Sequence, residues 1–184
     1  EGEADGVFND NDYIIFYAKG PHRWDVAPSN NGFQNTRHIY SNASYYFINI
    51  NPNTLPERIQ NVNSSSATPT HFVNSYSYYA VHEVDNVNLT RSGVRWYGEK
   101  FDVELTRNFS FSIPNPVINT PSIAKISMAS DSRSTANGSI NYNINGANLL
   151  TTQVPSNGDG NYGISVNNIP FNNSNSTINV TITF

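Results

Sequence analysis

The sequence predicts an all-β protein, in which an aromatic-rich β part is followed by an antiparallel β-sandwich. Three observations predict this fold class. Good helix formers are scarce, apolar residues in the second half mostly recur at every second position, and pairs rich in Asn, Gly and Pro separate the runs. A spacing of two is the period of a strand with one buried face. Turn signals between such short strands are typical of antiparallel sandwiches.

The N-terminal part, residues 1–105, is the richer in aromatic residues and carries most of the charge. It contains two continuous apolar runs at residues 13–17 and 45–50, which end at Gly20-Pro21 and Asn51-Pro52 respectively. A run that is apolar at nearly every position suits a strand with both faces covered. We therefore predict two central strands here.

Two later stretches of the N-terminal part are less regular. Residues 61–70 are polar, include three consecutive serines, and are predicted to form a loop. In residues 72–83, Val73, Tyr76 and Ala80 fit a helix face, whereas Tyr76, Tyr78 and Ala80 fit a strand face. We favour a strand, because tyrosine is enriched in strands.

The second part, residues 106–184, shows clear alternation. At its end Ile178, Val180, Ile182 and Phe184 alternate with polar residues. Similar runs occupy residues 109–113, 124–128, 140–144 and 162–166, and turn signals such as Asn145-Gly146 separate them. The sequence thus predicts a domain at 1–105 and a β-sandwich at 106–184.

The composition excludes several classes of protein. Charged residues make up only 13% of the chain and the formal net charge is -4, which argues against a nucleic-acid partner. There is no cysteine, and therefore no disulfide, thiolate metal site or cysteine nucleophile within these residues. No stretch approaches the roughly 18 apolar residues of a membrane-spanning helix. The chain instead contains 30 asparagines, so polar, uncharged strand faces are expected.

The residues that most often carry chemistry form no recognisable site. The four histidines, His22, His38, His71 and His82, share no zinc-binding spacing, and we expect structural or surface roles for them. Only His82 adjoins a carboxylate, that of Glu83. No nucleophile elbow, phosphate-binding glycine loop or dinucleotide fingerprint is present. No catalytic or cofactor-binding residue is therefore assigned.

Calcium is the one metal for which the sequence offers candidate ligands. Oxygen-bearing side chains gather around Gly6, and the candidates among them are Asp5, Asn9, Asp10 and Asp12. Calcium takes six to eight oxygen ligands, but this order of residues does not match an EF-hand loop. The alternative is a turn capped by Asn and Asp side chains.

The aromatic residues allow two interpretations. The clustered tyrosines, together with Trp24 and Trp96, could form a platform on which sugar rings stack. Such residues more often belong to the core of a domain. The first interpretation would make the chain a carbohydrate-binding or adhesin-like module.

Two groups of motifs, in this order, resemble one protein family. The first comprises residues 5–8 (DGVF), 12–21 (DYIIFYAKGP), Trp24 and 40–47 (YSNASYYF); the second comprises 82–85 (HEVD), Asn88 and 92–101 (SGVRWYGEKF). At this spacing they resemble the region ahead of the catalytic domain in PorU-like proteins. These are the type IX secretion sortases of Bacteroidetes, relatives of the gingipain-type cysteine peptidases. The similarity continues, by pattern, into the sandwich.

The resemblance implies a scaffold without catalytic residues of its own. In the family a caspase-like domain with a His-Cys dyad follows this region. It cuts the C-terminal signal from secreted cargo at the cell surface and, in sortases, attaches the cargo to a lipopolysaccharide. This chain would then be a segment of a longer peptidase on the outer side of the outer membrane. Its partners would be the catalytic domain, other secretion components and the cargo signal domains.

The residue types suggest roles within the motifs, and the resemblance suggests a feature at the end of the sandwich. Gly20, Pro21 and Gly98 would shape the backbone. Arg95 and Glu99 would form a charge pair around Trp96 and hold its loop. Because the family sandwich runs on into a further strand, the sheet here would lack a strand and leave an open edge beside the last one.

Overall fold

The predicted all-β class is confirmed by the computed structural model. It describes residues 7–27, 32–49, 51, 53, 59–60, 62–89, 91, 93, 95–131, 137–154 and 162–184. These residues contain no helix. They form eight strands: β1 (Arg23–Ala27), β2 (Gly32–Thr36), β3 (Thr106–Ser112), β4 (Thr120–Asp131), β5 (Gly138–Ile144), β6 (Ala147–Val154), β7 (Tyr162–Asn173) and β8 (Thr177–Thr183). Every pairing between them is antiparallel.

The chain divides into two compact units, Glu1–Ser77 and Tyr78–Phe184. The first unit contains the hairpin β1–β2, and the second contains the other strands. The sequence predicts a division between residues 105 and 106, where β3 begins. Residues 78–105, which precede β3, cluster with the sandwich in the second unit.

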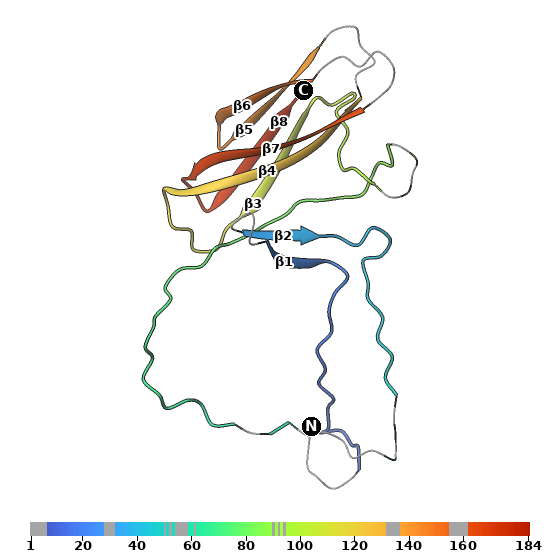
Figure 1. Cartoon of the computed structure of the whole chain (residues 1–184), viewed down its shortest axis with the longest axis vertical. Coiled ribbons are helices and arrows are strands. Elements are labelled where there is room, and N and C mark those ends of the chain that lie inside the picture. Colours follow the sequence, from blue (N-terminus) through green and yellow to red (C-terminus); the bar gives the residue numbers. More distant parts are fainter. Residues whose placement is uncertain are drawn as a thin grey trace. The chain divides into compact units, whose positions relative to one another are not determined.

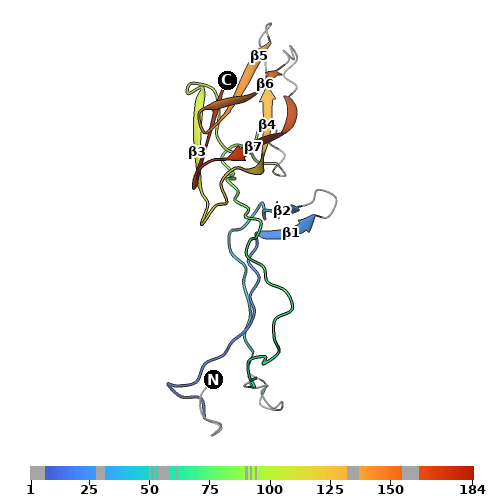
Figure 2. The ribbon, with the colours of Figure 1, turned by 90° about the vertical axis from the view of Figure 1, so that its left-hand side faces the viewer.

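The second unit is a sandwich of two antiparallel sheets (Figures 1 and 2). One sheet has the strand order β3-β8-β5-β6, and the other consists of β4 and β7. Inward side chains of both sheets form one core, whose buried members are Ile140, Tyr142, Ile144, Val154, Ile169, Ile178, Val180 and Ile182. The five alternating runs predicted after residue 106 are thus confirmed as β3, β4, β5, β7 and β8.

A two-residue turn joins β5 to β6. Asn145 and Gly146 both have positive φ angles, 51° and 88°. This is the conformation of a type I′ hairpin turn, which the Asn-Gly pair predicts. Asn145 also ties the turn to β8, because its backbone N–H donates to the carbonyl of Asn179 and its Oδ1 accepts from the Asn179 N–H, both at 2.9 Å.

Tyr142 on β5 links the two sheets through the core. Its side chain is 0% exposed. The hydroxyl donates to Sδ of Met128 on β4 at 3.3 Å and accepts from Nδ2 of Asn167 on β7 at 3.1 Å. Burial raises the pKa of Tyr142 above its ordinary value of 10.0, and side-chain hydrogen bonds, first that of Asn167, offset part of this rise.

The strands predicted at residues 13–17, 45–50 and 72–83 are wrong. The described residues of these runs lie outside any strand and most of their side chains are exposed; Ile50 lies outside the described residues. Apolar runs form central strands only where neighbouring strands and layers cover them. In the first unit the described ladder is confined to β1 and β2, and Figure 1 draws these runs as plain trace.

The sequence predicts an open sheet edge beside the last strand, but the structure places the open edges elsewhere. β8 pairs with β3 along its whole length and with β5 over residues 180–183. Among the described residues, the open edges of the sandwich belong instead to β3, β6 and both strands of the β4–β7 sheet. The last strand is therefore central to its sheet.

The Tyr142 hydroxyl should stabilise the sandwich through Asn167. Tyr142→Phe removes the acceptor and leaves the Asn167 amide without it in the core. We expect the free energy of unfolding in urea to fall by about 1 to 3 kcal/mol. The double variant Tyr142→Phe, Asn167→Leu should recover most of this loss, because it removes both polar partners. A Tyr142→Phe variant as stable as the wild type would contradict the linking role.

Tyr142 should also make the sandwich sensitive to alkaline pH. Its pKa is raised on folding, so the folded state favours the neutral phenol. Its contribution is fully present below about pH 10, the value for the unfolded chain, and is lost as the pH rises towards the folded-state value. The stability difference between wild type and Tyr142→Phe should therefore be constant from pH 7 to 9 and shrink above pH 10. A difference that grows with pH would refute this.

Candidate functional site

The outer face of the four-stranded sheet carries only uncharged polar side chains. On β3, β5 and β8 its positions alternate with inward-facing residues; on β6 a register shift places Asn148 and Thr151, three residues apart, on the same face, with the 39%-exposed Leu149 between them. The positions of the face are Thr106, Asn108, Ser110 and Ser112 on β3, Thr177, Asn179, Thr181 and Thr183 on β8, Ser139, Asn141 and Asn143 on β5, and Asn148, Thr151 and Gln153 on β6. We call this surface the polar face.

Hydrogen bonds between neighbouring strands order the side chains of the polar face. The bonded pairs are Thr181–Asn108 (2.7 Å), Thr151–Asn141 (2.8 Å), Ser110–Asn179 (3.0 Å) and Thr106–Thr183 (3.2 Å). In the first two pairs a threonine hydroxyl donates to an asparagine Oδ1. The amide NH₂ groups of those asparagines therefore remain as donors at the surface.

A shallow groove lies at the centre of the polar face. It has a volume of about 450 Å³ and is lined by Asn141, Asn143, Asn148, Thr181 and Thr183. The lining contains no charged and no aromatic side chain. Asparagine amides both donate and accept, and so do threonine hydroxyls. The groove can therefore exchange several hydrogen bonds with a ligand that also donates and accepts.

The second motif folds into a small cluster beside β3. Nε2 of His82 lies 2.8 Å from Oε1 of Glu99, and the His82 ring packs against Phe109 with 4.9 Å between centroids. Gly98 packs against Val84 in the same cluster, where an added Cβ would lie 3.3 Å from the Val84 side chain. The cluster brings together residues from both halves of the motif. It attaches residues 78–105 to the sandwich.

The pair expected between Arg95 and Glu99 is not among the ion pairs of the described residues. Glu99 contacts His82 instead, and Arg95 is exposed. Trp96 is held in another way, since its Nε1 donates to the carbonyl of Gly93 at 3.3 Å. Glu83 is adjacent to His82 in sequence, but the carboxylate that His82 contacts is that of Glu99. The pairing of Val87 with Tyr97 brings Glu99 back towards His82.

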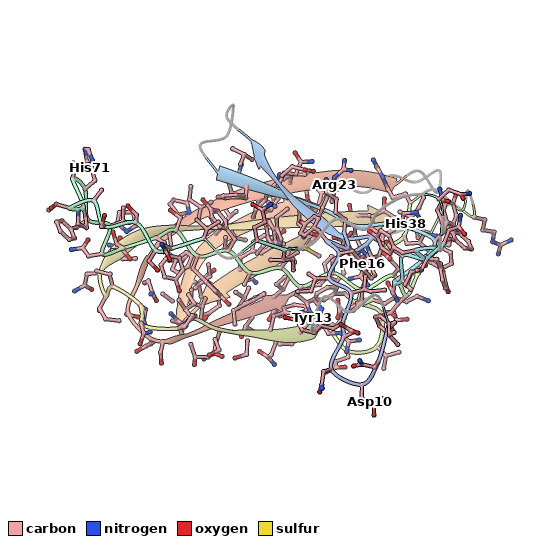
Figure 3. All side chains as sticks on the ribbon, turned by 90° about the horizontal axis from the view of Figure 1, so that it is seen from below. Asp10, Tyr13, Phe16, Arg23, His38 and His71 are labelled. Carbon is pink, nitrogen blue, oxygen red and sulfur yellow. The ribbon has the colours of Figure 1, made fainter. Side chains whose placement is uncertain are left out.

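Two histidines of the first unit organise its backbone. Nδ1 of His22 accepts from the backbone N–H of His38 at 3.1 Å, and its Nε2 lies 3.1 Å from Oδ1 of Asn42. Nδ1 of His38 accepts from the backbone N–H groups of Tyr40 and Ser41. Gly20 and Pro21 lead into this loop, and His71 lies far from it in Figure 3. These contacts shape the first motif and need no ligand.

The candidate calcium ligands form a capped turn. Oδ2 of Asp12 accepts from the Asn9 backbone N–H at 3.0 Å, and Oδ1 of Asn9 accepts from the Asn11 N–H at 3.2 Å. Asp10 lies at the tip of this turn (Figure 3), and Asp5 lies outside the described residues. No group of three or more His, Asp or Glu side chains gathers in the part of the chain that the structure describes. Calcium binding stays a prediction.

No protein-family model and no curated protein matches this chain. Among the described residues, no helix is long and apolar enough to cross a membrane. The family resemblance therefore depends on the sequence motifs alone, and the structure shows only where the residues of these motifs lie.

His82 should hold residues 78–105 together through Glu99 and against β3 through Phe109. Because the His82 and Glu99 side chains are partly exposed, we expect His82→Ala to change the global unfolding free energy by no more than about 1 kcal/mol. The local effect should be larger: hydrogen exchange of the paired Val87 and Tyr97 amides should speed up. Arg23→Ala, which breaks the exposed Arg23–Asp25 pair, is the control. Unchanged protection in His82→Ala would argue against this role.

Proposed function

We propose that this chain is the non-catalytic region ahead of the catalytic domain in a PorU-like, gingipain-type cysteine peptidase of the type IX secretion system. It acts outside the outer membrane as a scaffold, and its first partner is the catalytic domain of the same parent chain. The observation that carries the proposal is that residues 13–17 and 45–47, both within the first motif group, expose their aromatic rings.

The exposed rings need a covering surface. Phe47 is 97% exposed, and Tyr17 and Tyr45 are each more than four-fifths exposed. The two runs touch each other only lightly: the Phe16 and Tyr46 rings are 6.0 Å apart, and the Tyr46 hydroxyl bonds the backbone of Lys19. Burying a side chain of this size contributes about 1.5 to 3 kcal/mol. Contiguous apolar exposure of this kind marks an interaction site.

The chemistry of these runs favours a protein partner. Tyrosine and phenylalanine are enriched in protein interfaces, where charged residues are depleted, and residues 13–17 contain no charge. An extended segment outside any strand also matches a partner that supplies a strand edge. The catalytic domain is the partner that the family places next in the chain. Other secretion components and the cargo signal domains are further candidates.

The first test is the sequence of the parent gene. The proposal predicts that codons after Phe184 continue into a domain with a His-Gly pair and a cysteine at the end of a strand, within a few hundred residues. Sequencing the locus, or the corresponding transcript, measures this directly. A stop codon shortly after Phe184 would contradict it.

A second test compares two exposed phenylalanines in the parent protein. Phe47 lies in a motif, whereas Phe72 is 84% exposed and lies outside the motifs. We expect Phe47→Ser to lower cargo processing several-fold in cells and to make residues 13–17 more sensitive to limited proteolysis. Phe72→Ser should leave both at the wild-type level. Equal effects of the two substitutions would mean that the motif rings have no specific partner.

A further inference from the structure

We propose that the polar face of the sandwich binds a neutral polysaccharide. The observation that suggests this is the composition of the face. About fourteen neighbouring positions point outward from its four strands, and all of them carry Asn, Thr, Ser or Gln. Solvent-facing residues are ordinarily a mixture of charged and uncharged polar side chains. The 30 asparagines of the chain make uncharged strands expected, but an outer face with neither charged nor apolar side chains among its alternating positions is specific to this sheet.

The composition belongs to this face and not to the sandwich as a whole. The outward positions of the β4–β7 sheet include Ile123, which is 71% exposed, Val166, which is half exposed, and Lys125. The same unit therefore places apolar and charged side chains on one outer surface and excludes them from the other. The richness of the chain in asparagine does not by itself explain this difference.

The chemistry of the face selects among classes of ligand. Nucleic acids are bound through lysine and arginine, which the face lacks. Membrane surfaces require apolar or basic side chains, and protein interfaces are built around aromatic residues, Met and Arg. A neutral polysaccharide presents hydroxyl groups that both donate and accept hydrogen bonds. The Asn amides and Thr hydroxyls of the groove match this requirement.

The geometry also suits such a ligand. Groups on the face form a regular grid, because side chains repeat about every 6.6 Å along a strand and strands lie about 4.8 Å apart. The cross-strand hydrogen bonds hold Asn108, Asn141, Thr151 and Thr181 in place before a ligand arrives. Ordering these side chains in advance lowers the entropic cost of binding. The groove is shallow and open, which suits an extended chain lying along the face rather than an enclosed small molecule.

The test measures the mobility of the full chain in native gels that contain a soluble glucan, mannan or galactan. We expect at least one of these to retard the protein. Two variants probe the face. Asn143→Asp adds a charge while keeping the acceptor for the Gly146 N–H, and Thr181→Val removes a hydroxyl while keeping the side-chain shape. Each should weaken the affinity about tenfold, as expected for the loss of one hydrogen bond.

The matched control is Asn168→Asp, the same chemical change at an exposed position on β7, which should bind like the wild type. Thermal melting checks that all variants fold. Retardation that is absent with every neutral polysaccharide, or equal in the face variants and the control, would overturn the proposal. So would binding only to heparin or to anionic lipid vesicles. Neither result bears on docking through the aromatic runs, because the two proposals involve different residues.

Discussion

The Tyr142 phenol is the contact on which the sandwich depends. The β4–β7 sheet has only two strands, and such a ribbon is stable only when its apolar side packs on another layer. Tyr142 reaches from the middle of the larger sheet to both of its strands, through Met128 and Asn167. The inward-facing Asn167 would otherwise carry a desolvation cost in the core. One side chain thus provides both apolar volume and the hydrogen bond that sets the position of the ribbon.

The open edges of the β4–β7 sheet are protected by proline. The ladder pairs Ile123 with Pro170 and Pro121 with Asn172. Because these two pairs lie two residues apart along each strand, they are either both hydrogen-bonded or both non-hydrogen-bonded pairs. Proline cannot donate to a ladder, so both prolines fit rungs that carry no hydrogen bond to the partner strand and face the free edges. Lys125 adds a charge to β4. These features oppose the addition of a further strand at either edge.

The sandwich was predictable from the sequence to a larger extent than the N-terminal unit. Alternation finds β5 and β8 because each has one buried face, whereas β6 escapes notice because a register shift near Asn143 interrupts its pattern. From the sequence, the strands of the polar face could be predicted only to be uncharged. Which side chains lie side by side on the face depends on the strand order β3-β8-β5-β6, which the sequence does not reveal. The contact of His82 with Glu99 spans a loop closed by Val87 and Tyr97, which local spacing does not reveal.

The errors at residues 13–17 and 45–50 follow from a physical ambiguity. An apolar run indicates that its side chains are to be buried, but not whether the residues that bury them belong to the same unit. In the sandwich the second sheet supplies it; around Phe47 nothing in the described part of the first unit does. With only 13% charged residues, the chain has few charges to keep such rings apart in solution. The exposure that defeats the strand prediction is thus the same observation that supports the proposed docking partner.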